Sequence, residues 1–328
     1  MTDEVTDSLE FKYYTPIQLS NLADKYGNYL RLSMFHVNVR SLNANFNKLI
    51  TFLNSLSFNF DVISLSEIWS TNISYYSNLL PTHDFFYVLP LNKAGGVGMY
   101  ISKKLNPKVT LKYLPPPSPH QLQCYKSLWV EIQSDTYSIV IGCFYRHPNS
   151  PITLFTENFL FSLDKLKNVK YCYIFGDFNI SLSNYSTNNL TRAYVDSVLD
   201  AKFLPYIYLP TRITDHSSTI IDHVYSNDLF TENYICKTGL IISEIADHCS
   251  KFMFLIDNDP KLSKNHIVER TTIRNYSRVN LDKFNNFLAA ADWSSVLSCS
   301  DPNVSLDRFL KIFTGIHDNC FTLINIKN

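Results

Sequence analysis

Short runs of apolar residues recur along the chain from Arg31 onward, and several of them end in a polar or acidic residue. Such runs, with alternating or continuous hydrophobic positions, predict β-strands, because a strand places successive side chains on opposite faces. Gly95 and Gly96 mark a turn before one of these runs. We expect strands at residues 31–38, 61–67, 96–102, 127–133, 137–145, 171–177, 219–226, 234–242 and 251–256.

A different spacing, with apolar residues three and four positions apart, predicts helices. Phe46, Leu49 and Leu53 follow this spacing in the segment 45–57. Further helices are expected at residues 153–167, 190–201, 281–290 and 305–320. Many strands interleaved with few helices favour an α/β fold in which two packed mixed β-sheets are flanked by helices. We therefore predict a four-layer α/β sandwich with a C-terminal helical extension.

Composition divides the chain into three parts. Residues 1–28 mix charged and polar groups and are interpreted as an N-terminal leader. Residues 29–257 hold the predicted strands and are long enough for one large domain. In residues 258–328, the stretch 261–283 contains six Lys or Arg and precedes the last two predicted helices. We interpret this last part as a basic linker and a helical connector.

Composition and charge disfavour several classes of protein. Hydrophobic residues make up 45% and aromatic residues 14% of the chain, which argues against a disordered protein. Twenty-nine Lys and Arg balance 29 Asp and Glu, whereas a passive DNA coat protein needs excess positive charge for its affinity. None of the eight glycines supplies the glycine-rich strand-to-helix turn of a P-loop or dinucleotide fold.

Cysteine usage and the apolar runs indicate the compartment. The seven cysteines form no CxxC pair, which disfavours a zinc site and a disulfide framework and favours a reducing intracellular compartment. The N-terminus is acidic and lacks the apolar core of a signal peptide. The longest apolar runs, such as 137–145, are too short to span a bilayer, so we expect no membrane partner.

The strongest local motif is GDFNI at residues 176–180. It ends a predicted strand, and the alternation of an extended chain places Asp177 and Asn179 on one side with Phe178 on the other. A carboxylate and an amide side by side can activate a water and hold a phosphoryl oxygen. Asp and Asn also end strands as turn formers, so the motif alone leaves a purely structural interpretation open.

Other polar residues stand at or near the ends of predicted strands. Glu67 offers a carboxylate to Mg²⁺, a hard cation that prefers oxygen ligands, although acids in such positions are often simply solvated. Asn38 closes the first strand, where turn formation is the alternative. Asp222 stands inside an apolar run and needs a partner if it is buried. Asp247 and His248 offer a second carboxylate and an imidazole.

The order of these pieces is more specific than any single one. The series HVNVRSL, LSEIW, FYRHP, GDFNI, IDHVYSN and ADHCS resembles the endonuclease/exonuclease/phosphatase superfamily over roughly residues 31–257. In detail it looks like the endonuclease domain of non-LTR (LINE-type) retrotransposon proteins. The tail at 271–297 is similar to the connector that joins this endonuclease to a reverse transcriptase, an RNA-directed DNA polymerase whose own motifs are missing from this sequence.

The resemblance implies a Mg²⁺-dependent phosphodiesterase, with Mn²⁺ as an alternative ion. Glu67 would be the principal metal ligand, with Asn38 beside it holding the metal or the phosphate. Asp247 would complete the carboxylate set on the metal side. Asp177 would orient or deprotonate the attacking water, and Asn179 would stabilise the pentacovalent phosphate.

The resemblance also implies roles for the remaining motifs. Tyr145 would bind the phosphate or assist at the leaving group. Asp222 would hydrogen-bond His248, fix its tautomer and favour an imidazolium directed at a phosphoryl oxygen. Contacts with DNA are implied for Arg146, Thr211 and Arg212.

An enzyme of this kind would nick one strand of double-stranded chromosomal DNA and leave a 3′-hydroxyl that primes reverse transcription. Element RNA would then be a partner through the missing polymerase part, and the nucleus would be the expected location. Two residues depart from the family pattern. Ala246 stands where the family often has serine, and Arg40 occupies the place of a second acid in repair-type relatives.

Two alternatives stay open. The first is another phosphodiesterase of the superfamily, such as an abasic-site repair nuclease or a phosphatase on lipid or inositol phosphates. Arg40 and the connector-like tail argue against it. The second is an inactive mobile-element relic that acts at most as a DNA-binding module, against which the intact acid set argues.

We predict no catalytic role for the basic residues outside the motifs. His223 neighbours Asp222 but should point the opposite way on a strand. The remaining histidines are interpreted as surface or packing residues: His36, His83, His120, His147, His216 and His266. One group of lysines either lines a DNA groove or forms a solvated edge: Lys103, Lys104, Lys108 and Lys112.

Overall fold

The computed structural model describes residues 12–70, 73–91, 94–116, 124–133, 138–227, 234–257, 272–274, 278–321 and 323–325. The chain divides into two compact units, residues 1–259 and 260–328.

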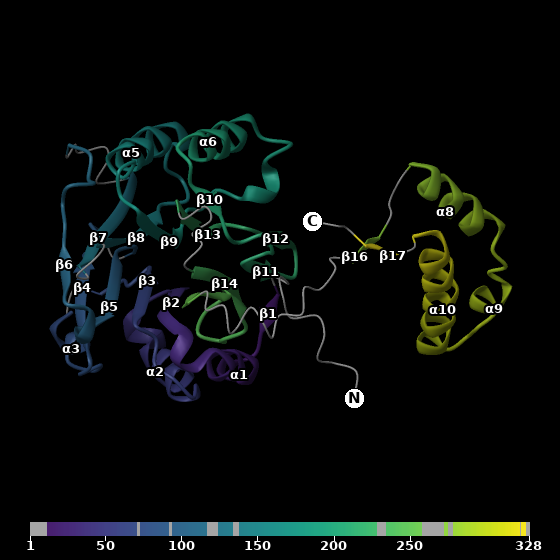
Figure 1. The fold of residues 1–328 in the computed structure, drawn as a ribbon, viewed down its shortest axis with the longest axis horizontal. Coiled ribbons are helices and arrows are strands. Elements are labelled where there is room, and N and C mark those ends of the chain that lie inside the picture. The colour runs from purple at the N-terminus through teal and green to yellow at the C-terminus, as the bar shows by residue number, and fades with distance from the viewer. Residues whose placement is uncertain are drawn as a thin grey trace. The chain divides into compact units, whose positions relative to one another are not determined.

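The larger unit is built on two mixed β-sheets (Figure 1). The first sheet contains, in spatial order, β1 (Tyr13–Tyr14), β14 (Tyr234–Ile241), β15 (Ser250–Asp257), β2 (Leu30–Asn38), β3 (Val62–Ser66), β5 (Val97–Ser102) and β4 (His83–Val88). The second contains β10 (Leu204–Pro205), β13 (Asp222–Ser226), β9 (Tyr171–Asp177), β8 (Ser138–Arg146), β7 (Tyr125–Gln133) and β6 (Pro107–Val109).

Helices flank the two sheets on opposite sides (Figure 1). On the side of the first sheet lie α1 (Pro16–Tyr26) and α2 (Leu42–Asn54), and on the side of the second lie α5 (Ile152–Lys165) and α6 (Asn189–Asp200). Short helical turns are α3 (Ser74–Ser77), η1 (Gly27–Tyr29), η2 (Lys103–Leu105) and η3 (Leu182–Asn184). The predicted four-layer α/β sandwich is confirmed.

Alternation along the strands explains the layers. In β2, Met34 points between the sheets into a core shared with β9, whereas Phe35 points outward and stacks on Phe52 of α2 at 5.4 Å. In β8, Cys143 faces the same inter-sheet core, and Phe144 packs against the α5 side. These two strands therefore bury both faces, which is why their sequences read as nearly continuous apolar runs.

Two parallel strand pairs set the position of the polar strand ends. β2 pairs with β3 so that Asn38 lies opposite Ser66, and β8 pairs with β9 so that Tyr145 lies opposite Asp177. In antiparallel β13, Asp222 lies opposite Asp177. The register thus brings the carboxyl ends of β2, β3, β8 and β9 and the start of β13 to one edge of the sandwich, where ligand-binding groups of α/β folds gather.

The N-terminal boundary and the segment 219–226 need correction. Residues 12–28 belong to the folded unit, because β1 pairs in parallel with β14 and Thr15 caps α1 through a capping box. The strand expected at 219–226 is β13, preceded by an unpredicted hairpin of β11 (Arg212–Thr214) and β12 (Ser217–Thr219). The hairpin strands are only three residues each, too short to show a period.

The smaller unit contains α8 (Arg278–Ala290), α9 (Ser294–Leu297) and α10 (Pro302–Cys320), with β16 (Thr272–Arg274) paired to β17 (Leu323–Asn325). The predicted helical extension is therefore present. Phe284 of α8 meets Phe313 of α10 edge to face at 5.6 Å. Most of the predicted basic linker lies outside the described residues. Within the described part of the chain, no helix is both long enough and apolar enough to cross a membrane.

Candidate active site

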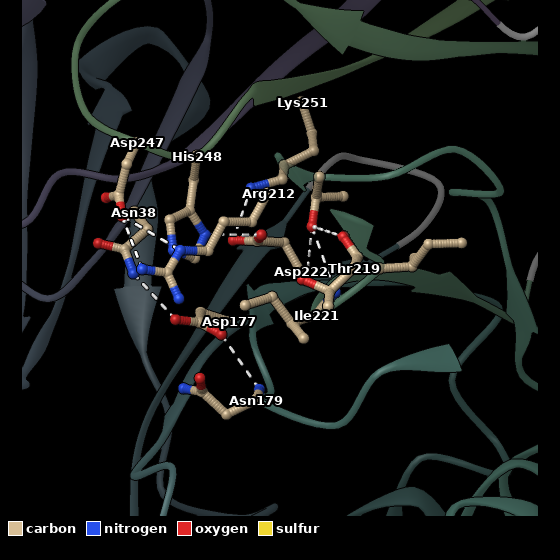
Figure 2. A network of polar contacts seen from close by, with 12 residues as sticks. Asn38, Asp177, Asn179, Arg212, Thr219, Ile221, Asp222, Asp247, His248 and Lys251 are labelled. Atoms are coloured by element: carbon tan, nitrogen blue, oxygen red, sulfur yellow. Dashed lines mark hydrogen bonds and ion pairs between the residues drawn. The ribbon is translucent and has the colours of Figure 1, made fainter. Parts of the chain in front are cut away.

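A single amide joins two carboxylates at the shared edge of the sheets. Nδ2 of Asn38, the last residue of β2, donates to Oε1 of Glu67 and to Oδ2 of Asp177, at 2.9 Å each. Glu67 directly follows β3, and Asp177 ends β9, so one side chain connects the two sheets. The three residues that the sequence singled out on separate strands therefore form one cluster, of which Figure 2 labels Asn38 and Asp177.

The backbone around this cluster adopts conformations that side-chain-bearing residues seldom take. Glu67 and Asn179 have φ angles of 57° and 49° in the left-handed region. Asn tolerates that region, whereas for Glu it costs free energy that the surrounding contacts must offset. Ser41 supplies one such contact by donating its backbone N–H to the carbonyl oxygen of Glu67 at 2.8 Å. Strain held in place at polar strand ends is typical of functional sites.

A buried chain of charges lies beside the cluster. Nδ1 of His248 is 2.8 Å from Oδ2 of Asp222, and Nζ of Lys251 forms an ion pair with Oδ1 of the same carboxylate at 2.7 Å. Asp222 and Lys251 are fully buried. One ligand atom each from Asp177, Asp222 and His248 lies within 4.8 Å of the others. Figure 2 shows the His248 ring between the Asn38–Asp177 pair and Asp222.

The pKa shifts follow from burial and from this charge arrangement. Burial raises the pKa of Asp177, and the nearby Asp222 carboxylate raises it further. Burial alone would also raise the pKa of Asp222, but His248 and Lys251 together hold it far below its usual range. Burial alone would lower the pKa of His248, yet the Asp222 carboxylate raises it above the ordinary value. Asp222 is thus kept ionised and favours a protonated imidazole.

Glu67 and Tyr145 form the other side of the cluster. Burial raises the pKa of Glu67, the hydrogen bond from Asn38 opposes this, and the charge of Asp247 adds to the increase. Burial and the charge of Glu67 raise the pKa of the Tyr145 hydroxyl, so this group stays protonated and can donate. Gly95 permits the approach of the tyrosine ring, because a Cβ there would lie 3.0 Å from it. His147 packs edge to face on the same ring at 4.9 Å.

The donor set at Glu67 suits a hard divalent cation. Glu67, Asn38 and Asp247 offer oxygen atoms, the ligands that such a cation prefers. Oδ1 of Asp247 is buried and accepts no hydrogen bond from the described part of the chain. The group of Asp177, Asp222 and His248 suits a cation less well, because both oxygens of Asp222 already face His248 and Lys251. The Glu67 side therefore offers the more suitable candidate metal site, and the Asp222–His248 pair is available for proton and phosphate contacts.

Two of the three predicted DNA contacts are wrong. The Arg146 side chain is buried, with only 2% of the residue exposed, and its guanidinium donates to the carbonyl oxygens of Phe178, Asn179 and Ser150. Thr211 is fully buried, and its Oγ1 accepts the backbone N–H groups of Ile221 and Asp222 at 3.2 and 3.1 Å. Both side chains position residues of the site.

Arg212 is the predicted DNA contact that remains accessible. Its side chain is 40% exposed and donates from Nε and Nη2 to Oδ2 of Asp247, at 3.1 and 2.9 Å. The β11–β12 hairpin, which the sequence did not reveal, carries it, and a single β-bridge links Arg212 to His248. Lys251 is a residue of the site that the sequence analysis did not identify. A lysine inside the apolar run KFMFLI was the available signal, because a buried cation requires a partner.

The histidines without a predicted catalytic role that the structure describes are packing or surface residues. His223 points away from Asp222, stacks on Phe178 at 4.7 Å and faces the carbonyl oxygen of Ile180. His36 and His83 are buried packing residues, and His216 is exposed, whereas His120 and His266 lie outside the described residues. Lys103 follows β5 at the end away from the site, since Val97 at the other end pairs with Ser66. Lys112 pairs with Glu131 at 2.8 Å, with 64% of its side chain exposed.

Comparison with known proteins agrees with the geometry. Residues 36–240, more than half of the chain, match the model of the endonuclease/exonuclease/phosphatase family. The chain belongs to this family. Family membership gives it the fold of phosphodiesterases and nucleases. A search of curated protein sequences finds no significant match.

Solved structures of this family share the fold at low sequence identity. The endonuclease domain of TRAS1, a telomere-specific non-LTR retrotransposon, is similar with a TM-score of 0.54 and 10% identity, over 70% of this chain and 99% of that chain. The 3′-5′ exonuclease NExo from Neisseria meningitidis gives 0.54 and 13%, over 69% and 100%. An AP endonuclease from Archaeoglobus fulgidus gives 0.51 and 12%, over 68% and 99%.

Proposed function

We propose that this chain is a Mg²⁺-dependent endonuclease that nicks one strand of double-stranded DNA and leaves a 3′-hydroxyl. The single observation that carries the proposal is the convergence of Glu67, Asn38 and Asp177 beside the Asp222–His248 pair. A phosphodiester is an anion attacked by water, so its hydrolysis needs positive charge at the phosphoryl oxygens and a carboxylate near the water. This site offers both.

The residues divide the chemistry between them. A bound Mg²⁺ would supply Lewis-acid stabilisation of the developing negative charge, held by Glu67, Asn38 and Asp247. Asp177 accepts from Nδ2 of Asn38 through one oxygen and from the backbone N–H of Asn179 through the other, so its carboxylate is fixed to orient and deprotonate the water.

His248 and Tyr145 complete the proposed mechanism as donors. Because Nδ1 of His248 faces Asp222, its Nε2–H is the proton available to a phosphoryl oxygen. Tyr145, kept protonated by its surroundings, donates its O–H to the phosphate or to the leaving oxygen. Asn179 donates one N–H of Nδ2 to the carbonyl oxygen of Arg146 and keeps the second for the phosphate.

The retrotransposon assignment is the finer part of the proposal. It is supported by the fold shared with an endonuclease domain of a non-LTR retrotransposon, by the helical extension after Asp257, and by the connector-like sequence at 271–297. Arg40, in place of a second acid, argues against an abasic-site repair enzyme. In this assignment the 3′-hydroxyl primes reverse transcription of element RNA, and the enzyme works in the nucleus.

Nicking of a supercoiled plasmid in Mg²⁺ tests the proposal. The unmodified chain should convert plasmid to open circles, and Asp177→Ala should lose about 10²-fold or more of that rate, because it lacks the base. Asp164→Ala on the exposed face of α5 is the matched control and should nick normally. A DNA polymerase should extend the nicked product directly, which reports the 3′-hydroxyl.

The alternatives give different outcomes in the same assay. Equal nicking by the unmodified chain and Asp177→Ala would overturn the mechanism. A strong preference for a duplex with an abasic site would favour a repair nuclease, and release of phosphate from inositol phosphates without plasmid nicking would favour a phosphatase. Absence of all three activities in a folded chain would favour the inactive relic.

A further inference from the structure

Two arginines from distant parts of the chain meet on one oxygen of Asp247. Nη1 of Arg40 lies 3.2 Å from Oδ2 of Asp247, and the Arg212 guanidinium contacts the same oxygen at 2.9 Å through Nη2. Arg40 lies between β2 and α2, and Arg212 lies in the hairpin strand β11. We call Arg40, Arg212 and Asp247 the rim cluster.

The rim cluster is connected to the metal side of the site through Arg40. The backbone N–H of Arg40 donates to Oδ1 of Asn38 at 3.0 Å, the same side chain that joins Glu67 and Asp177. Arg40 has a φ angle of 43°, in the left-handed region, so the chain turns sharply after β2. Because the backbone of Arg40 is held by the amide side chain of Asn38, the long Arg40 side chain starts from a fixed position.

Charge and exposure differ between the rim cluster and the residues around the reacting phosphate. Two guanidinium groups share one carboxylate, which leaves the cluster positive. The side chains of Arg40 and Arg212 are 55% and 40% exposed, whereas Asp177 and His248 are buried. A guanidinium carries five N–H donors in a planar fork that suits phosphate oxygens, and an ion pair with Asp247 leaves most of them for a second anion.

We infer that the rim cluster binds the phosphate next to the scissile one in the same DNA strand, with Arg40 as a substrate-binding residue. This inference rests on the proposed function and narrows its substrate class to a polynucleotide, because an isolated phosphomonoester or a small diester has no second phosphate to offer. Asp247 then has two tasks, one oxygen toward the metal and the other holding both guanidinium groups.

Salt-dependent DNA binding by the inactive Asp177→Ala chain tests the inference without turnover. Each phosphate contact contributes about 0.9 to the slope of log affinity against log salt. Adding Arg40→Gln should therefore reduce the slope by about one. The double variant should bind DNA more weakly than Asp177→Ala alone, and this difference in affinity should become about threefold smaller between 50 and 200 mM salt. Arg40→Lys keeps the charge and should restore most of the slope.

Arg31→Gln is the matched control. Arg31 lies at the start of β2, far along the strand from the site, and also forms an exposed ion pair, with Asp257. It should leave the slope unchanged. In the active chain, Arg40→Gln should slow plasmid nicking by a larger factor than it slows hydrolysis of a small aryl phosphodiester.

The outcomes separate this inference from the proposed function. An unchanged slope with Arg40→Gln, or an equal reduction with Arg31→Gln, would overturn the rim cluster as a phosphate site even if the chain nicks DNA. A reduced slope specific to Arg40→Gln would support the rim cluster even if no nicking occurs, in which case the proposed activity alone fails.

Discussion

Arg146 and Asn179 hydrogen-bond each other in both directions. Nδ2 of Asn179 donates to the carbonyl oxygen of Arg146 at 2.7 Å, and Nη1 of Arg146 donates to the carbonyl oxygen of Asn179 at 3.1 Å. Arg146 ends β8 and Asn179 follows β9, so the pair joins the ends of two parallel strands. The same guanidinium also donates to the carbonyl oxygens of Phe178 and Ser150. Arg146 is therefore a buried side chain that supports the backbone next to Asp177.

Replacing Arg146 should affect folding and catalysis but leave the salt dependence of DNA binding unchanged. We expect Arg146→Met to lower the free energy of unfolding by about 2–4 kcal/mol, because buried carbonyl oxygens lose their donor. Nicking should fall further than the loss of folded protein explains, since Asn179 is no longer fixed. Urea unfolding and nicking rates measured at a temperature where the variant is folded would check this.

The slope of log DNA affinity against log salt distinguishes Arg146 from the exposed Arg212. Arg212→Gln removes an exposed guanidinium and should reduce the slope, whereas Arg146→Met should leave it unchanged. A reduced slope in Arg146→Met with normal stability would mean that this arginine contacts DNA after all.

Lys251 and Asp222 form an ion pair with both side chains fully buried. Removing Lys251 leaves the buried Asp222 carboxylate with His248 as its remaining cationic partner, and breaking such a buried pair costs up to about 3–5 kcal/mol. We expect Lys251→Met to destabilise the chain by about that amount, measured by urea unfolding at neutral pH. The loss should exceed that of Lys126→Met, a buried lysine in β7.

The double variant decides whether the coupling is direct. With Asp222→Asn added, the remaining charge is gone, and part of the stability lost in Lys251→Met should return. Strictly additive losses in the two single variants and the double variant would show that Lys251 and Asp222 do not interact energetically.

His223 should make the fold sensitive to acid. Burial lowers the pKa of His223 from its ordinary 6.5 to about 4. The folded chain therefore holds this ring neutral at a pH where the unfolded chain would take up a proton. The chain loses no stability from this group above pH 6.5; stability then falls as the pH drops from 6.5 to about 4, by about 3 kcal/mol at most.

Urea unfolding between pH 7 and pH 4 measures this effect. His223→Gln should start less stable at pH 7 and lose less stability on acidification than the unmodified chain. His36 is also buried and has a lowered pKa, so the variant should still lose some stability as the pH falls. Parallel curves for the two chains would contradict the assignment of the acid sensitivity to His223.

The sandwich was predictable from the sequence because its strands are long and buried on both faces. The run YSIVIGCFY and its neighbours identify the central strands, and the order of polar strand ends identifies the site cluster. The elements that the sequence did not predict include β1, β10 and the β11–β12 hairpin, of two or three residues each, and also the longer β4 and α1. The position of the short strands depends on partners distant in sequence, which a local pattern does not contain.

The direction in which a side chain points was the least predictable property. Arg146 and Arg212 are both arginines near the site, yet one is buried against carbonyl oxygens and the other is exposed beside Asp247. Motif order placed both near DNA, because a motif records proximity to the site and carries no information on burial. Thr211 was misread for the same reason.

Glu67 offers a test of the metal site that does not depend on activity. Burial raises the pKa of this carboxyl, so its ionised form is costly when no cation is bound. Glu67→Gln keeps the shape and the acceptor for Nδ2 of Asn38 while removing the charge. We therefore expect the metal-free variant to have a higher Tm than the metal-free unmodified chain, a gain in stability at the cost of function.

Addition of Mg²⁺ should reverse this order. At about 100 times its Kd, Mg²⁺ should stabilise the unmodified chain by about 2.7 kcal/mol, because it binds the folded state alone. Glu67→Gln lacks the principal ligand and should show a much smaller rise in Tm over the same titration. Glu157→Gln, which removes an exposed acid from α5, controls for general charge effects and should respond to Mg²⁺ like the unmodified chain. Equal rises in all three proteins would exclude Glu67 as the metal ligand, whatever the nicking assay shows.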